Sequence, residues 1–127
     1  ALPRGRRIGP GEIGVLAALG ITTAPVYQPP SMIVFSSGDE VMPVAAPLQP
    51  GQVRDINGPA LIALAKQAGF AAAAGGILPD AATQLRQSLS QAMAYYDIVV
   101  ISGGSSQGQK DMTSAILDEI ARALPRA

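Results

Sequence analysis

The chain has 127 residues, a length typical of one domain, and its 9 Lys and Arg balance 9 Asp and Glu. A balanced charge gives no support for binding to nucleic acid or to an acidic membrane surface. There is no Cys and no His, which excludes zinc sites, thiol nucleophiles and imidazole bases. Any chemistry must therefore use carboxylates, Lys and Arg, hydroxyls, backbone amides or a hard metal ion.

The first 30 residues are interpreted as a lead-in from a preceding domain, with a short helix and a short strand. Pro10 and Gly20 mark the two ends of the helix, and Thr22–Val26 is expected to be extended. The arginines near the N-terminus indicate a solvated linker, and no apolar run approaches the roughly 20 residues that a membrane span needs. Because the chain does not begin with Met, we expect it to be part of a larger protein.

Residues 31–127 are predicted to form one α/β domain, truncated at its C-terminal end. Strands are expected at Ile33–Phe35, Phe70–Ile77 and Asp97–Ser102, the last buried on both faces because its β-branched run is continuous. Between the first two lies a proline-rich stretch, residues 37–56, which predicts a long loop.

Each expected strand is followed by a helix with a capping residue at its start. These predicted caps are Asn57, Asp80 and Asp111. Alternating strands and helices predict right-handed parallel crossovers. The predicted fold class is therefore a three-layer α/β/α sandwich with a mostly parallel sheet.

Ligands of open parallel sheets bind beyond the carboxyl ends of the strands, and here those loops are acidic. They carry Asp39 with Glu40, then Asp80, then Asp111, while Gly103–Ser106 precedes a helix N-terminus. Glycine amides and a helix N-terminus favour an anion, and carboxylates favour a hard cation. A phosphate and a bridging cation would together make a consistent site at this rim.

Each of these features also has a purely structural interpretation. Asp80 and Asp111 can be helix caps, Gly103–Gly104 a tight turn, and Asp39–Glu40 a solvated turn. A Walker loop is excluded because Lys110 falls one place late after the glycines and no hydroxyl follows it. No Gly-x-Gly-x-x-Gly follows a strand, so a dinucleotide site is unsupported.

Three segments resemble motifs of the molybdopterin-binding domain family, and their order and spacing are most similar to those of molybdopterin molybdenumtransferases. These segments are Ser36–Val41, Gly51–Gly58 and Ser102–Asp111. They correspond to Thr-Gly-Asp-Glu-Leu, Gly-x-Ile-x-Asp-Ser-Asn and Ser-Gly-Gly-Val-Ser-x-Gly-x-x-Asp in the family. The family's Lys-Pro-Gly-Lys-Pro segment follows beyond this sequence. We therefore expect other domains of the same protein to complete the site.

The resemblance implies a cytoplasmic, homodimeric enzyme of molybdenum cofactor biosynthesis. Such an enzyme binds adenylylated molybdopterin, inserts molybdate and releases AMP with Mg²⁺. Glu40, Asp80 and Asp111 would be the catalytic and metal-binding carboxylates. The resemblance implies pterin-binding roles for Ser37, Gly38, Asp39, Asp55, Asn57, Gly103, Gly104, Ser105, Ser106 and Gly108.

Two alternatives to this enzyme remain open at the level of sequence. One is a non-catalytic molybdopterin-binding module. The other is a sister protein of the molybdopterin adenylyltransferase type.

Overall fold

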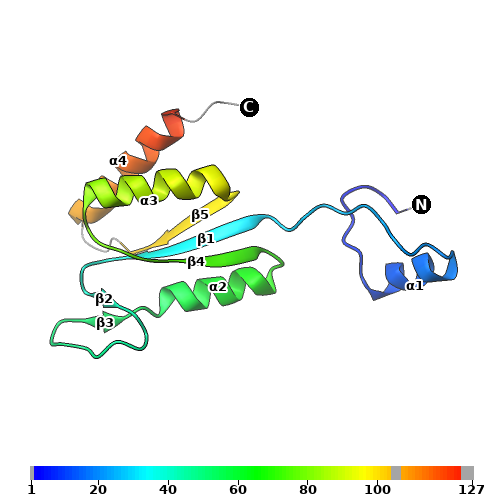
Figure 1. The fold of residues 1–127 in the computed structure, drawn as a ribbon, viewed down its shortest axis with the longest axis horizontal. Coiled ribbons are helices and arrows are strands. Elements are labelled where there is room, and N and C mark those ends of the chain that lie inside the picture. The colour runs from blue at the N-terminus through cyan, green and yellow to red at the C-terminus, as the bar shows by residue number, and fades with distance from the viewer. Residues whose placement is uncertain (1, 104–106, 124–127) are drawn as a thin grey trace.

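A parallel sheet forms the centre of the chain in the computed structural model, which describes residues 2–103 and 107–123. The sheet contains β1 (Ser31–Ser37), β4 (Ala71–Leu78) and β5 (Ile98–Ser102) in the order β4-β1-β5. Helix α2 (Asn57–Gln67) covers one face, whereas α3 (Ala82–Tyr95) and α4 (Gln107–Ala123) cover the other (Figure 1). The predicted three-layer sandwich with a parallel sheet is confirmed.

Strand β1 is the central and most deeply buried strand. Ile33 and Phe35 pack toward α3 and α4, and the alternation of a strand sends Val34 to the face covered by α2. The main core lies between the sheet and the two helices above it. Its other buried members are Leu78, Leu85, Leu89, Ala92, Ile116 and Ile120. Burying each leucine contributes about 1.5–3 kcal/mol.

A bulge in β4 makes room for the Phe35 ring of the neighbouring strand β1. Val34 pairs with Ala74 but Phe35 pairs with Gly76, which leaves Gly75 as the extra residue. A Cβ at Gly75 would lie 2.4 Å from the Phe35 ring. The bulge therefore needs glycine at this position.

Strand β5 is half-buried along its whole length, so its predicted burial on both faces is wrong. It has a hydrogen-bonded neighbour, β1, on one side only within the described chain. The β-branched run therefore reflects strand propensity rather than a central place in the sheet.

The stretch between β1 and α2 is more ordered than the predicted loop. It contains β2 (Val41–Met42) and β3 (Val53–Arg54), which pair in parallel. Their register is fixed by backbone bonds from Val53 N to Glu40 O, 2.9 Å, and from Asp55 N to Met42 O, 2.8 Å. Two residues per strand give too little pattern for sequence analysis to detect them.

The three predicted helix caps are wrong as caps. Helix α2 begins at Asn57 itself, α3 begins at Ala82, two residues after Asp80, and α4 begins at Gln107. Asp111 therefore lies in the second turn of α4. Its first turn holds Gln and Lys, which are good helix formers, and Gly108 costs only about 1 kcal/mol there.

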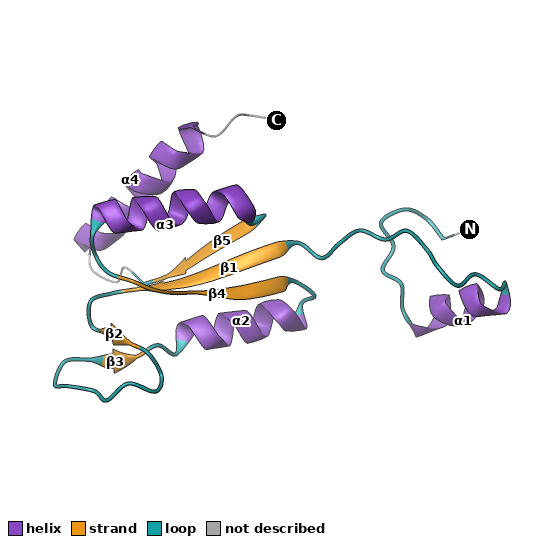
Figure 2. Cartoon of the chain, viewed as in Figure 1, coloured by secondary structure: helices purple, strands orange, loops and turns teal. Residues whose placement is uncertain are grey.

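The N-terminal segment lies apart from the sandwich (Figure 2). Its predicted helix is present as α1 (Pro10–Ala18), but no strand forms at Thr22–Val26. Glu12 accepts a bond from Gly9 N and pairs with Arg6 at 2.6 Å, which fixes the helix start. No residue of α1 is buried. None of the helices in the described chain is long and apolar enough to cross a membrane.

Candidate functional site

The connections of the sheet define one place where a ligand crevice is expected. From β1 the chain passes through α2 to β4 on one side, then through α3 to β5 on the other side. The helices after β1 and β5 consequently lie on opposite faces (Figure 1). In such sheets the crevice lies beyond the carboxyl ends of the two strands where the direction reverses, here β1 and β5.

The backbones that leave β1 and β5 touch at this point. Gly103 follows β5 with φ +144°, and a Cβ on it would lie 2.2 Å from Ser37 O of β1. Gly38 also has φ +144°, and a Cβ there would lie 2.9 Å from Glu40 Oε2. Only glycine fits at either position without displacing its neighbours. The loops after β1 and β5, both predicted to bind the ligand, are therefore in contact where they leave their strands.

Three of the predicted site residues form a hydrogen-bonded cluster on the α3 side of this rim. The Ser37 hydroxyl donates to Asp80 Oδ1 at 3.3 Å, and Asp39 N donates to Asp80 Oδ2 at 3.3 Å. In return Asp80 N donates to Asp39 Oδ1 at 3.0 Å. Asp80 lies 41 positions after Asp39 in the sequence, and these bonds join the loop after β4 to the loop after β1. Capping α3 is not its role.

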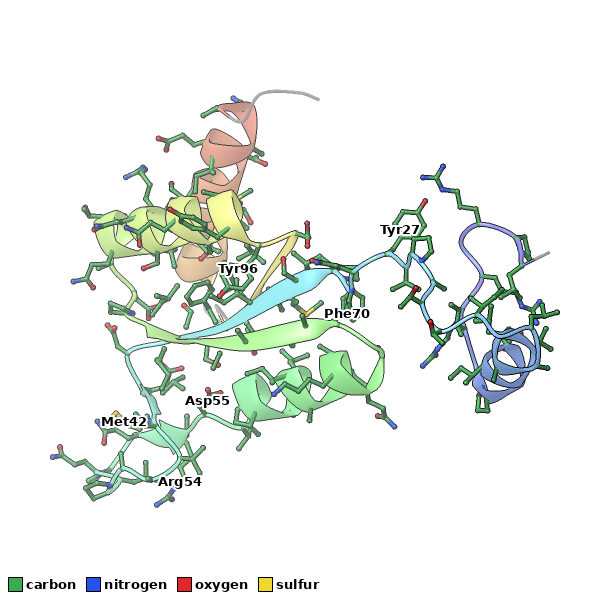
Figure 3. All side chains as sticks on the ribbon, turned by 45° about the vertical axis from the view of Figure 1, so that its right-hand side comes forward. Tyr27, Met42, Arg54, Asp55, Phe70 and Tyr96 are labelled. Atoms are coloured by element: carbon green, nitrogen blue, oxygen red, sulfur yellow. The ribbon has the colours of Figure 1, made fainter. Side chains whose placement is uncertain are left out.

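A second serine–aspartate pair lies on the α2 side. The buried Ser36 hydroxyl donates to Asp55 Oδ1 at 2.8 Å, and Gly58 N donates to the same oxygen at 2.9 Å. Figure 3 shows Asp55 between β3 and the start of α2, next to Arg54. Asp55 therefore satisfies the start of α2, the role that the sequence assigned to Asn57.

The rim carries four described carboxylates, those of Asp39, Glu40, Asp55 and Asp80. Of these, Asp39 and Asp80 are joined by backbone hydrogen bonds in both directions, and Asp55 accepts from Ser36 and Gly58. Carboxylate oxygens gathered at one place are ligands that a hard cation prefers. An anionic ligand would need a hard cation beside it.

The other predicted site residues are placed only in part. Gly108 lies in the first turn of α4 and Asn57 in the first turn of α2. Gly104, Ser105 and Ser106 lie outside the described residues, as does the side chain of Asp111. The described acidic residues form no group of three that could hold a metal ion. Glu40 and Asp80 are brought to the same rim.

Sequence analysis missed Ser36 and Gly58. A Cβ on Gly58 would lie 2.5 Å from Asp55 Oδ2 and 3.0 Å from Ser36 Oγ, so glycine is needed for this contact. The available signal was a pair of serines that ends an apolar strand. Such hydroxyls are buried and need partners.

These features define a class: a parallel α/β/α domain whose candidate ligand site lies beyond the carboxyl ends of its first and last described strands. Comparison with known proteins identifies the family. Residues 33–126 match the family model described as "Probable molybdopterin binding domain". The chain belongs to that family, and the resemblance drawn from its motifs is confirmed.

Relatives with established names cover nearly the whole chain. It is 42% identical over 116 residues to a molybdopterin molybdenumtransferase of Nostoc, which covers 91% of this chain and 27% of the relative. A Haemophilus influenzae protein of the same name is 32% identical, with 95% and 30% covered. The structure of a molybdopterin biosynthesis protein from Pyrococcus has a TM-score of 0.79 at 34% identity, with 91% and 28% covered. The chain thus spans less than a third of each relative.

Proposed function

We propose that this chain is the molybdopterin-binding part of a molybdopterin molybdenumtransferase. Its ligand would bind beyond the carboxyl ends of β1 and β5. The contact residues would come from the loops after β1, β4 and β5. They are Ser37, Gly38, Asp39, Glu40, Asp80, Gly103, Gly104, Ser105, Ser106, Gly108 and Asp111.

One observation carries this proposal. The family model spans residues 33–126, and the loops that carry the family-like motifs leave neighbouring strands at the point where Gly103 packs on Ser37 O. A family match without this convergence would support the fold alone. Convergence without the match would not indicate which ligand binds.

A magnesium ion fits the donor chemistry of this rim. Glu40, Asp80 and Asp111 would hold it, because carboxylate oxygens are the ligands that Mg²⁺ prefers. The bound ion would supply positive charge that offsets the phosphates of the substrate. The protein's own groups would orient the ligand: the Ser37 hydroxyl and the Asp39 amide organise Asp80, and glycine amides approach the ligand closely.

The wider activity extends this proposal to the longer protein. That protein would take adenylylated molybdopterin and molybdate as substrates, insert the metal and release AMP. It would work in the cytoplasm as a homodimer, with its other domains completing the site. The two named relatives cited above support this activity because they are molybdopterin molybdenumtransferases.

The test is calorimetric titration of the 127-residue chain with adenylylated molybdopterin, with and without Mg²⁺. We expect Mg²⁺ to tighten binding, and we expect Asp80→Asn to remove most of that gain. Asp118→Asn is the matched control, because Asp118 is an exposed carboxylate on α4. Binding unaffected by Asp80→Asn would overturn the site.

Activity of the longer protein separates the remaining alternatives. Molybdate insertion lost in Asp80→Asn supports the transferase. Tight binding with no insertion by the wild-type protein would instead indicate a non-catalytic module. Transfer of AMP from ATP to molybdopterin would indicate the adenylyltransferase type.

A further inference from the structure

We infer that Asp55 is a positioning residue, which acts through the buried Ser36 hydroxyl and the α2 N-terminus to hold Glu40 at the rim. The inference rests on the proposed function and deepens it. Asp55 belongs to a family-like motif, so direct contact with the ligand is the simpler expectation. The contacts of its carboxylate favour a different role.

The carboxylate of Asp55 is already engaged within the protein. Its Oδ1 accepts from Ser36 Oγ at 2.8 Å and from Gly58 N at 2.9 Å. Its Oδ2 lies so close to Gly58 that a Cβ there would come within 2.5 Å. This side chain is packed against α2 and β1. Two strong acceptor bonds would have to break before it could turn to a ligand.

We call the Ser36–Asp55 hydrogen bond the anchor, and its position shows which part of the chain it holds. Residues 38–54 form an excursion that leaves β1 after Ser37, and the chain comes back to β1 at Asp55, so the Ser36–Asp55 bond closes the base of this excursion. At that base β3 also binds the backbone of the rim, because Val53 N donates to Glu40 O at 2.9 Å. The carboxylate proposed to hold the cation is therefore connected to β1 through Asp55.

Loss of the anchor would leave buried polar groups without their partner. Ser36 is 3% exposed, and its hydroxyl and the Gly58 amide both depend on Asp55 Oδ1. An unsatisfied buried group is unfavourable, so the excursion would shift to let water reach it. Glu40 would move with it.

The molecule contains a matched control. Ser31 and Asp97 form a second serine–aspartate pair between β1 and the residue before β5, with bonds of 2.7, 2.7 and 3.0 Å. This pair lies at the opposite end of the same strand from the rim. Its loss would weaken the fold without reaching Glu40.

The experiment compares Asp55→Ala, Asp55→Asn and Asp97→Ala in the 127-residue chain. We expect Asp55→Ala to weaken Mg²⁺-dependent binding of adenylylated molybdopterin about tenfold or more, and Asp97→Ala to leave it within about threefold. Asp55→Asn should restore binding, because an amide oxygen accepts both bonds. If Asn is as poor as Ala, the charge of Asp55 acts on the ligand directly and the inference is overturned.

Hydrogen exchange of the unliganded chain provides a readout that does not need the ligand. Asp55→Ala should speed exchange at the amides of Val41 and Val53, which donate to Gly38 O and Glu40 O. Asp55→Asn and Asp97→Ala should not. Unchanged exchange in Asp55→Ala would refute the anchor even if the ligand bound normally. Faster exchange together with no binding by the wild-type chain would refute the proposed function alone.

Discussion

Strand β1 is held at each end by hydrogen bonds between a serine and an aspartate. Ser31 with Asp97 holds its start, and Ser36 with Asp55 holds its end. The two bonds from Ser31 to Asp97 favour the charged carboxylate, and they hold the pKa of Asp97 below its ordinary value of 3.8. The same pairing of serine with aspartate thus joins β1 to different neighbours at its two ends.

This pKa predicts how stability depends on acid. A carboxylate with a lowered folded-state pKa contributes stability above its unfolded pKa, and that stability is lost as pH falls through the folded value. We expect the free energy of unfolding to decrease below about pH 4, and Asp97→Asn to flatten part of that decrease. Urea unfolding of both proteins across pH 2–6, roughly the range of carboxylate titration, measures it. Identical pH profiles would contradict the assignment.

Gly103 predicts a large cost for a single methyl group. Gly103→Ala combines an unfavourable φ with a clash against Ser37 O, so we expect a loss of about 2–4 kcal/mol in unfolding free energy. Gly69→Ala is the control, because Gly69 has φ +95° but open space around it, and should lose only about 1 kcal/mol. Equal losses in chemical denaturation would show that the contact between the ends of β1 and β5 tolerates a side chain.

At the level of helices and strands, hydrophobic patterning predicted which elements are present. Candidate capping residues did not predict the residue at which each helix begins. The strand at Ile33–Phe35 was predictable from its β-branched and aromatic residues, and the strand at Phe70–Ile77 from an apolar run at its place in the alternation of strands and helices. Helix starts were not, because an aspartate before a helix satisfies a long-range partner as readily as a cap. Asp80 is the example: its carboxylate is bonded to the loop after β1. The convergence of the loops followed from topology, but the Ser36–Asp55 contact requires the fold.

Helix α3 contributes the most buried part of the core, whereas α2 has a large apolar side chain that is exposed. Leu89 is 0% exposed, so Leu89→Ala should lower unfolding free energy by about 2–5 kcal/mol. Leu64→Ala on α2 should change it by no more than about 0.5 kcal/mol, because Leu64 is 61% exposed. Denaturation of both variants checks this. Similar effects would mean that α2 is packed more tightly than its exposure indicates.

In the molecule as a whole, the N-terminal segment and the sandwich are built differently. The sandwich has a core, whereas the segment surrounds a half-open hollow of about 900 Å³ whose apolar lining includes the exposed side chains of Leu19 and Val26. This hollow is formed entirely by residues 2–27 and includes no rim residue. Tyr27 is exposed on the connection between this segment and β1 (Figure 3).

This separation predicts that the segment adds nothing to the stability of the sandwich. A chain of residues 29–127 should unfold with the free energy of the full chain to within about 0.5 kcal/mol, because α1 buries no residue. Residues 29 and 30 are kept because Pro30 O accepts a bond from Ala71 N. Urea denaturation of the two proteins is the measurement. A clear loss would reveal contacts between the segment and the sandwich.

Ser36 and Ser37 are consecutive, yet they bind aspartates on opposite faces of the sheet. Adding or removing one residue earlier in β1 would exchange those faces and separate both pairs at once. The number of residues in β1 is therefore constrained by these two pairs. Residues 43–52, between β2 and β3, carry no such constraint. Descendants of this sequence should accumulate insertions and deletions there, and keep the count in β1 unaltered.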